Sequence, residues 1–442
     1  MKNKKFGIVL FIILFSYFLI LMDNSIIFTG TVKIASELHL NESELSWVSN
    51  AYTITFGGFL LLAGRLGDFV GRKRIFLAGL IIFGLSSLAV GLSQNPMQII
   101  SFRAIQGVGS AILAPTSLAI LMDNYQGDMR MKAISYYGAT AGIGSSVGLL
   151  LGGWLTSTFS WRMGFLINVP FTIFLIILTV FKIFDKNQPQ TTKIDFLGAF
   201  FSVIFALLFV YGITVSNMLL IILSALILVL FIVWEHSQTS PIMPLALFTN
   251  RIRSGAYIAR FTFMMAMLTY WFILPQIMQN HYGFTPLQAG MGFLPLTIVN
   301  FIAALYLPRL TVKLGNNKVM ILGQGILLVG MLLSAIIDPR NGYLLTIGLP
   351  MILVGIGQGW LLAPLTSAGV EGVSSELSGA ASGMTNTVHQ IGGPVGLSIV
   401  VLFTSNVLGN WLSYYHMVMG FVVAFNALGL GVLLFTNLGR KK

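Results

Sequence analysis

Cysteine is absent from this sequence of 442 residues, and charged residues are scarce. Without cysteine, the chain can form neither a disulfide nor a metal site that uses thiolates. Only 9% of the residues are charged, whereas 56% are hydrophobic. This composition excludes an ordinary soluble globular protein and indicates a chain that lies in a membrane.

Motifs of the common enzyme classes are also missing. The sequence has no HExxH zinc motif, no Walker phosphate loop, no Ser/His/Asp set and no pair of carboxylates inside an apolar run. We therefore expect no enzymatic activity, no metal ion and no cofactor. The formal net charge of +12 comes from basic residues in the short connections between apolar runs, so it indicates membrane topology and not nucleic-acid binding.

Apolar runs of about 20 residues, long enough to cross a bilayer as a helix, recur along the whole chain. They fall at 6–30, 46–63, 75–93, 98–122, 132–155, 163–181, 196–214, 218–234, 254–279, 287–308, 319–337, 343–367, 381–405 and 414–436. A membrane β-barrel would instead show alternating segments of about 10 residues. The first run is too long for the core of a signal peptide, so we expect an uncleaved helix. The sequence thus predicts an all-α membrane protein with 14 transmembrane helices.

The distribution of basic residues predicts the orientation of these helices. If the N-terminus lies in the cytoplasm, only Lys33, Arg162 and Arg340 of the 25 lysines and arginines fall outside the cell, and Arg103 and Arg260 fall within helices. Short cytoplasmic loops of membrane proteins are enriched in lysine and arginine. We therefore expect a multi-pass protein of the cell membrane with both termini in the cytoplasm.

Three short patterns occur twice, which indicates an internal duplication. Arg65-Leu66 with Gly71 returns as Arg309-Leu310 with Gly315, Gln106-Gly107 returns as Gln358-Gly359, and Gly144 with Gly148 returns as Gly392 with Gly396. Any one of these echoes can arise by chance among glycine-rich helices, but all three have offsets between 244 and 252 residues. We predict two related six-helix bundles, residues 1–183 and 254–442, and a linker at 184–253 that adds two helices.

The connection from Gly64 to Arg74, which reads GRLGDFVGRKR, resembles the inner-loop signature of the major facilitator superfamily. The chain also resembles that superfamily in its fourth and fifth helices, through Arg103, Gln106 and Gly107 and through Gly144, Gly148, Gly152 and Gly153. Over its whole length it is similar to the fourteen-helix drug:proton antiporters of the QacA and EmrB kind. It departs from them at Leu149, where the helix 5 signature usually has proline, and at Phe28 and Val32, where helix 1 often has asparagine and proline.

The resemblance implies the major facilitator fold and a chain that works as a monomer in the lipid bilayer. It also implies proton-coupled efflux of lipophilic drugs or dyes, often cationic or zwitterionic, by alternating access. Protons and small lipophilic compounds would then be the partners. Two other functions remain open at this point: a proton-linked importer or uniporter of a small metabolite, and a lipid transporter on the same fold.

Asp23 is the only acid deep inside an apolar span. An ionised side chain there costs about 2.5–3.5 kcal/mol on insertion scales, so its presence needs a reason. At about 1.5 Å per residue, Asp23 and Arg103 lie at similar depths below the outer helix ends, roughly 10 and 8 Å. We hypothesise that Asp23 carries the proton and that Arg103 approaches it in only one of the access states. The alternative is a permanent ion pair that only packs two helices together.

Candidate gating residues lie around the inner loop. The resemblance assigns Asp68, Arg72 and Asp123 to a cluster that forms when the cytoplasmic side closes. Gly64 and Gly71 belong to the same candidate site, because glycine allows positive φ angles and close approach of helices. A plain positive-inside turn is the simpler alternative, and it would explain Arg72 but not Asp68 or the glycines. We therefore predict a gating role for this cluster.

A glycine stripe is predicted on the fifth helix. Gly144, Gly148 and Gly152 are spaced by four residues, which places them on one face, and Gly153 follows directly. Another helix can approach such a face closely. We expect the stripe to seal the route between the bundles against proton leak.

Aromatic and amide side chains of both bundles are candidates for a substrate cavity, because aromatic faces attract cations and amides form hydrogen bonds. They are Tyr52, Phe56, Tyr136, Tyr137, Tyr270, Trp271, Asn300, Gln358, Trp360, Asn386 and His389. Contact with lipid or core packing explains any one of them equally well. For His389, a packing role with hydrogen bonds is the preferred interpretation over proton movement. Arg260 lies near the inner end of its helix, from where its side chain can snorkel to the interface, and we assign it no catalytic role.

Overall fold

The computed structural model describes residues 6–184, 195–239, 241–373, 377–407 and 409–437, without the side chains of Asp68, Ala141, Ser378 and Asn406. Over these ranges the chain is helical and contains no strand. Fourteen of its helical segments are long and apolar enough to cross a membrane. The prediction of an all-α protein with fourteen spans is therefore confirmed, although the helices extend beyond the predicted apolar runs.

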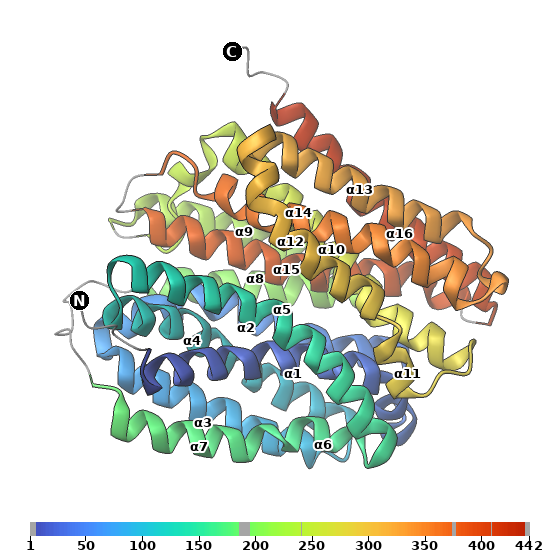
Figure 1. The fold of residues 1–442 in the computed structure, drawn as a ribbon, viewed down its shortest axis with the longest axis horizontal. Coiled ribbons are helices and arrows are strands. Elements are labelled where there is room, and N and C mark those ends of the chain that lie inside the picture. Colours follow the sequence, from blue (N-terminus) through green and yellow to red (C-terminus); the bar gives the residue numbers. More distant parts are fainter. Residues whose placement is uncertain (1–5, 185–194, 240, 374–376, 408, 438–442) are drawn as a thin grey trace.

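The first six spans form one half of the molecule, coloured blue to green in Figure 1. Their helices are α1 (Ile8–Leu38), α2 (Glu42–Val70), α3 (Arg72–Gly91), α4 (Pro96–Asn124), α5 (Gly127–Thr158), α6 (Trp161–Leu166) and α7 (Asn168–Lys182). The sixth span consists of α6 and α7 together. We refer to this half as the N-terminal bundle.

The last six spans form the other half, coloured yellow to red in Figure 1, and we refer to it as the C-terminal bundle. Its helices are α10 (Arg251–Asn280), α11 (Pro286–Met291), α12 (Leu294–Leu314), α13 (Asn316–Ile336), α14 (Leu349–Gly369), α15 (Ser378–Thr404) and α16 (Trp411–Asn437). One span consists of α11 and α12, and the short turn η3 (Leu344–Gly348) opens the span of α14. Because successive spans alternate in direction, α1 begins and α16 ends on the same side of the molecule. We name it the terminal side.

Glycine ends the second span of each bundle. Gly71 stops α2 with a φ of 108°, and Gly315 stops α12 with a φ of 82°. Residues with a side chain rarely adopt such angles, which lie in the region that glycine tolerates without strain. The two glycines that the sequence pairs as a repeat therefore also share a backbone conformation.

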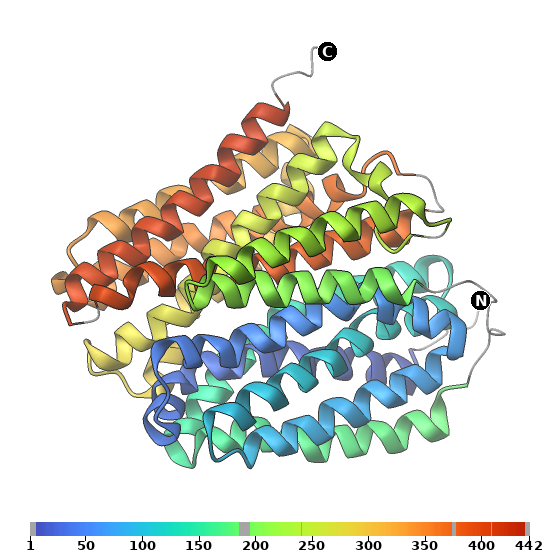
Figure 2. The ribbon, with the colours of Figure 1, turned by 180° about the vertical axis from the view of Figure 1, so that it is seen from behind.

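The two additional helices, α8 (Phe196–Thr214) and α9 (Met218–Ser237), cover the seam between the bundles, as Figure 2 shows. The α8 helix packs on α2 of one bundle and on α15 of the other. Ser398 of α15 accepts hydrogen bonds from Asn50 of α2 at 3.0 Å and from Thr214 of α8 at 2.9 Å. All three side chains are buried. The α8 helix thus joins both bundles, whereas most of α9 faces outward.

Candidate functional site

Asp23 and Arg103 form an ion pair inside the N-terminal bundle. Asp23 lies on α1 and Arg103 on α4, and neither side chain has any exposed surface. The guanidinium Nη1 of Arg103 donates to the carboxylate Oδ2 of Asp23 at 2.8 Å. The two residues that the sequence places at similar depths therefore meet in the folded protein, in a setting with no water to screen their charges.

Amide side chains complete the surroundings of the Asp23 carboxylate. Its Oδ1 accepts hydrogen bonds from Gln106 of α4 at 2.9 Å and from Asn168 of α7 at 2.7 Å. Gln106 also donates to the hydroxyl of Ser87 on α3 at 2.8 Å. Hydrogen bonds to a carboxylate are stronger than those between neutral groups. The carboxylate of α1 is thus bonded directly to α4 and α7, and Gln106 extends the network to α3.

Arg103 has partners besides Asp23. Its Nε donates to the carbonyl of Val48 on α2 at 3.1 Å, and Nη1 also donates to Gln106 Oε1 at 2.6 Å. The guanidinium lies 4.1 Å from the centre of the Tyr52 ring, and the Tyr52 hydroxyl donates to Ser110 at 2.8 Å. Arg103 would therefore keep these neutral partners if Asp23 became neutral, while its Nη2 is buried without a hydrogen-bond partner among the described residues.

Sequence reasoning did not find every member of this network. It identified Asp23 and Arg103, and it included Gln106 only as part of a family motif. Asn168 and Ser87 were not predicted, although an asparagine inside the apolar run 163–181 is a usable signal, because buried amides need hydrogen-bond partners. Tyr52, predicted to line a cavity, lies instead in the core against Arg103 and has no exposed surface.

The glycine stripe of α5 contacts two different helices. A Cβ added to Gly148 would lie 2.5 Å from the carbonyl oxygen of Met22, and one added to Gly152 would lie 2.6 Å from that of Ile26. Gly144 likewise packs on α1. Gly153 points elsewhere, since its Cβ would lie 2.6 Å from the carbonyl oxygen of Pro286 on α11. Three glycines thus hold α5 on the helix of Asp23, and the fourth holds it against the C-terminal bundle.

The structure describes part of the predicted gating cluster. Arg72, at the start of α3, donates to Asp123 near the end of α4 at 2.6 Å and to the carbonyl of Ala119 at 3.1 Å. Gly71 provides the turn before α3, and a Cβ on Gly64 would lie 3.8 Å from Pro115. The Asp68 side chain lies outside the described part of the structure. The Arg72–Asp123 pair therefore joins α3 to α4 within one bundle, on the terminal side.

The other aromatic residues predicted for the N-terminal bundle lie at two places. Phe56 packs edge to face on Tyr52. Tyr137 stacks on Tyr17 of α1 with ring centres 4.0 Å apart, and Tyr136 is about half exposed. Tyr17 was not among the predicted residues, because one tyrosine in an apolar run is not distinguishable from a core residue by sequence alone.

The residues predicted for the C-terminal bundle include three with unpartnered polar atoms. The Tyr270 hydroxyl, Gln358 Oε1 and His389 Nδ1 are buried and have no hydrogen-bond partner among the described residues. Of the remaining four, Trp360 donates to the carbonyl of Ala303, and Asn386 donates to the carbonyl of Ser382. Asn300 is half-buried. The ring of Trp271 lies 6.3 Å from the ring of Phe28 on α1.

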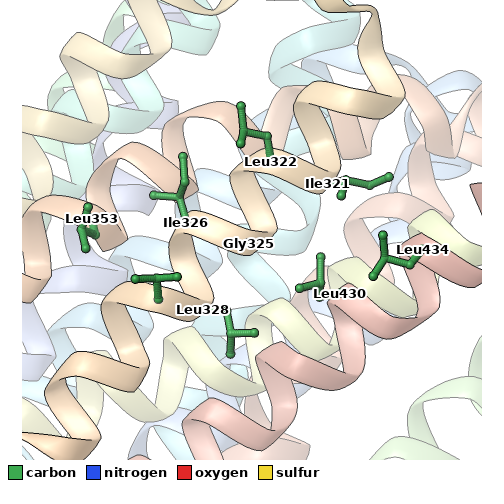
Figure 3. Close-up of a pocket in the computed structure, with 9 residues that line it drawn as sticks. Ile321, Leu322, Gly325, Ile326, Leu328, Leu353, Leu430 and Leu434 are labelled. Carbon is green, nitrogen blue, oxygen red and sulfur yellow. The ribbon is translucent and has the colours of Figure 1, made fainter.

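A pocket of about 530 Å³ lies elsewhere, on the outer face of the C-terminal bundle between α13, α14 and α16 (Figure 3). Its lining consists of hydrocarbon side chains and one glycine, among them Ile321, Leu353 and Leu434. Such walls offer no hydrogen-bond partner to a charged group. This pocket contains none of the polar residues described above.

Two bundles of six spans with two additional spans between them, and a charged pair buried in one bundle, define a multi-pass membrane transporter. The profile of the Major Facilitator Superfamily matches residues 13–397, so the chain belongs to this superfamily. Membership makes it a transporter and not an enzyme.

Several curated proteins resemble the chain over most of its length. It is 32% identical over 403 residues to the uncharacterized MFS-type transporter EfpA of Mycobacterium tuberculosis, which covers 88% of this chain and 75% of EfpA. It is 32% identical to the cephamycin export protein CmcT of Amycolatopsis lactamdurans, with 88% and 83% covered. It is 29% identical to the puromycin resistance protein pur8 of Streptomyces alboniger, with 97% and 89% covered.

Solved structures resemble the fold. A peptide transporter POT in complex with sulfate aligns with a TM-score of 0.75 at 16% identity, covering all of this chain and 97% of POT. The xylose transporter XylE from E. coli aligns with a TM-score of 0.69 at 13% identity, covering 98% and 96%. At these identities the comparison concerns the fold alone, and it confirms the major facilitator architecture.

Proposed function

We propose that this transporter exports small lipophilic drugs or dyes in exchange for protons, as a monomer with both termini in the cytoplasm. The proposal rests on the fully buried Asp23–Arg103 pair. A buried ion pair is seldom more stabilising than well-packed apolar side chains, so its presence favours a role beyond packing. A cephamycin export protein and a puromycin resistance protein resemble this chain, which supports outward transport of such compounds.

Proton uptake by Asp23 would weaken the contact between α1 and α4. A neutral carboxyl loses most of its attraction to Arg103, while Arg103 keeps the Val48 carbonyl, Gln106 and the Tyr52 ring. Arg103 would then be a buried cation without a counter-charge, a costly state that favours a shift of α1 relative to α4. The reverse step, in which Arg103 approaches Asp23, favours release of the proton.

The glycine stripe connects this change to the interface between the bundles. Gly148 and Gly152 hold α5 on α1 on both sides of Asp23, and Gly153 holds α5 against α11. At glycine contacts of this kind one helix backbone lies directly on the other, so a shift of one helix displaces its neighbour as well. A movement of α1 would thereby reach the C-terminal bundle.

The contacts between the bundles support a state that is closed on the side away from the termini. There, Ser157 of α5 accepts a hydrogen bond from the backbone of Leu287 at 3.0 Å, and Gln279 donates to the carbonyl of Thr29 at 3.2 Å. On the terminal half of α5, a Cβ on Gly138 or Gly142 would meet nothing within 4 Å. With the predicted orientation, this is an inward-facing arrangement.

Transport by the Asp23→Asn variant tests the proposal. In proteoliposomes with an imposed pH gradient and membrane potential, the wild type should move a lipophilic dye, rhodamine 110 or rhodamine 123, uphill against the proton flow. A proton gains about 2.3 kcal/mol per 100 mV and about 1.4 kcal/mol per pH unit, and the two together suffice for a gradient of several hundredfold of a solute without net charge. Asp23→Asn should lose uphill transport while still binding the dye.

Glu37→Gln is the matched control, because Glu37 lies on the same helix and pairs with Arg162 near the surface. It should transport like the wild type. Undiminished uphill transport by Asp23→Asn would refute the role of this carboxylate. Dye movement in the same direction as the protons would instead identify a proton-linked importer.

A further inference from the structure

Arg260 is a buried cation without a counter-charge. It lies on α10, about 14 Å along the helix from its start at Arg251, and only 8% of its surface is exposed. The expectation that it snorkels to the interface is therefore wrong, because its side chain points into the protein. Its Nη1 donates to the Thr366 hydroxyl at 2.6 Å and, less closely, to the carbonyl of Leu362 at 3.4 Å. Among the described residues no carboxylate lies within ion-pair distance of it, and its Nε is buried without a partner.

Arg253, a second buried arginine of α10, has a structural role with which Arg260 can be compared. Arg253 is also buried, with 5% of its surface exposed. Its three donor nitrogens reach the carbonyls of Leu247 at 2.5 Å, Ala246 at 2.9 Å and Glu371 at 3.1 Å. Carbonyls at three positions satisfy this guanidinium and fix the start of α10. Arg260 has no comparable set, so helix anchoring does not explain it.

Groups from both bundles surround Arg260. The α10 helix packs on α15, which carries His389, and is in contact with α1, which carries Tyr17, and both side chains lie within electrostatic range of Arg260. Tyr17 stacks on Tyr137 of α5, and His389 has an unpartnered, buried Nδ1. Counted from the terminal-side helix ends, all of these residues lie about 14–17 Å along their helices. They therefore share one level of the membrane, where the helices of the two bundles face each other.

An unpaired guanidinium at this depth is costly, and a polar site of this kind in a membrane is a functional one by default. Arginine presents two parallel N–H donors that match the two oxygens of a carboxylate. The stacked tyrosines beside it offer a flat surface to an aromatic ring.

We propose that Arg260, with His389 and Tyr17, binds the carboxylate of an aromatic substrate, so that this transporter prefers zwitterionic or acidic compounds to permanent cations. This proposal rests on the proposed export function and specifies its substrate class. The family resemblance implies cationic or zwitterionic substrates, and this proposal retains the zwitterionic compounds but not the permanent cations.

Two rhodamines that differ in one group provide the test. Rhodamine 110 has a free carboxylate, and rhodamine 123 is its methyl ester. Binding of each dye to the purified full-length protein in detergent is measured by fluorescence anisotropy at equilibrium, without any gradient. The wild type should bind rhodamine 110 at least fivefold more tightly than rhodamine 123. Arg260→Gln should weaken binding of rhodamine 110 about tenfold or more, equivalent to about 1.4 kcal/mol, and leave rhodamine 123 within about twofold.

Two further variants separate binding from folding. Arg260→Lys keeps the charge and should recover part of the affinity for rhodamine 110. Arg251→Gln removes an exposed arginine of the same helix, which donates to the carbonyl of Phe435, and should change neither dye. Equal loss of both dyes in Arg260→Gln, or no preference of the wild type for rhodamine 110, would overturn the proposal.

The two proposals fail in different measurements. The carboxylate site is tested by equilibrium binding alone, whereas proton-coupled export is tested by uphill transport under an imposed gradient. A wild type that prefers rhodamine 110 but transports no dye uphill would retain the carboxylate site and contradict the exporter. Uphill transport of rhodamine 123 that exceeds that of rhodamine 110, with equal binding of both dyes, would contradict the carboxylate site and retain the exporter.

Discussion

The contact between α5 and α1 at Gly148 can be tested with one methyl group. In Gly148→Ala, the new Cβ would lie 2.5 Å from the Met22 carbonyl oxygen and 2.9 Å from Ser25 Cβ. Ordinary van der Waals contact begins at 3.4 Å, so α5 must move away from α1 by the difference between 3.4 and 2.5 Å, about 0.9 Å.

The energy of this displacement follows from two opposing effects. Overpacking costs about 1–3 kcal/mol, and the upper end applies because the clash is with backbone. Alanine recovers about 1 kcal/mol of helix propensity relative to glycine. We therefore expect Gly148→Ala to destabilise the folded protein by about 2 kcal/mol and to slow export, because the helix that carries Asp23 shifts against α5.

Thermal unfolding of the purified protein, followed by tryptophan fluorescence, measures the first effect, and dye export from proteoliposomes measures the second. Gly142→Ala is the control, since it changes the same helix six residues earlier, at a position where a Cβ meets nothing within 4 Å. It should be as stable as the wild type or slightly more so. If Gly148→Ala behaves like Gly142→Ala in both assays, the contact does not hold α5 on α1 as described.

Two further variants address the charges. Asn168→Ala removes the 2.7 Å hydrogen bond that Asn168 donates to the Asp23 carboxylate. Because this hydrogen bond stabilises the ionised carboxylate, the pH midpoint of export should move upward by about one unit or more. An unchanged pH profile would exclude Asn168 from the network. Asp338, between the membrane spans, is exposed, and hydrogen bonds from the Arg340 side chain and backbone hold its pKa at about 2, below its usual value. Its pairing is therefore lost only as the pH falls from about 4 to about 2, so Asp338→Asn should leave the export profile between about pH 5.5 and 8 unaltered. A shifted profile would show that protons couple outside the buried network.

Hydropathy predicted the fourteen spans because a bilayer demands long apolar runs, but it underestimated the helix ends. The first run was expected to stop at residue 30, whereas α1 continues to Leu38. Polar residues such as Lys33 lower the hydropathy of this last part without breaking the helix, because helical hydrogen bonding does not depend on an apolar side chain. Hydropathy reports on lipid contact and not on helix length.

The depth of a polar side chain along the membrane could also be predicted from the sequence, but the side of the helix on which it lies could not. Counting residues placed Asp23 and Arg103 at one level, and they meet. The same counting could not show that Arg260 points inward or that Asn168 faces Asp23, because a helix that is apolar all round carries no pattern that identifies its buried face. The partners of buried polar residues in such helices become visible only in the folded structure.

The α1 helix provides a physical link between the two proposed sites. Tyr17, beside Arg260, precedes Asp23 by six residues, which is about 9 Å along the helix and about 240° around it. The two side chains therefore leave α1 on different faces, Asp23 toward the core of the N-terminal bundle and Tyr17 toward the C-terminal bundle, with which α1 is in contact. When protonation frees Asp23 from Arg103, a rotation or shift of α1 must also displace Tyr17. Cargo affinity at Arg260 would then depend on the proton at Asp23, as exchange of one for the other requires.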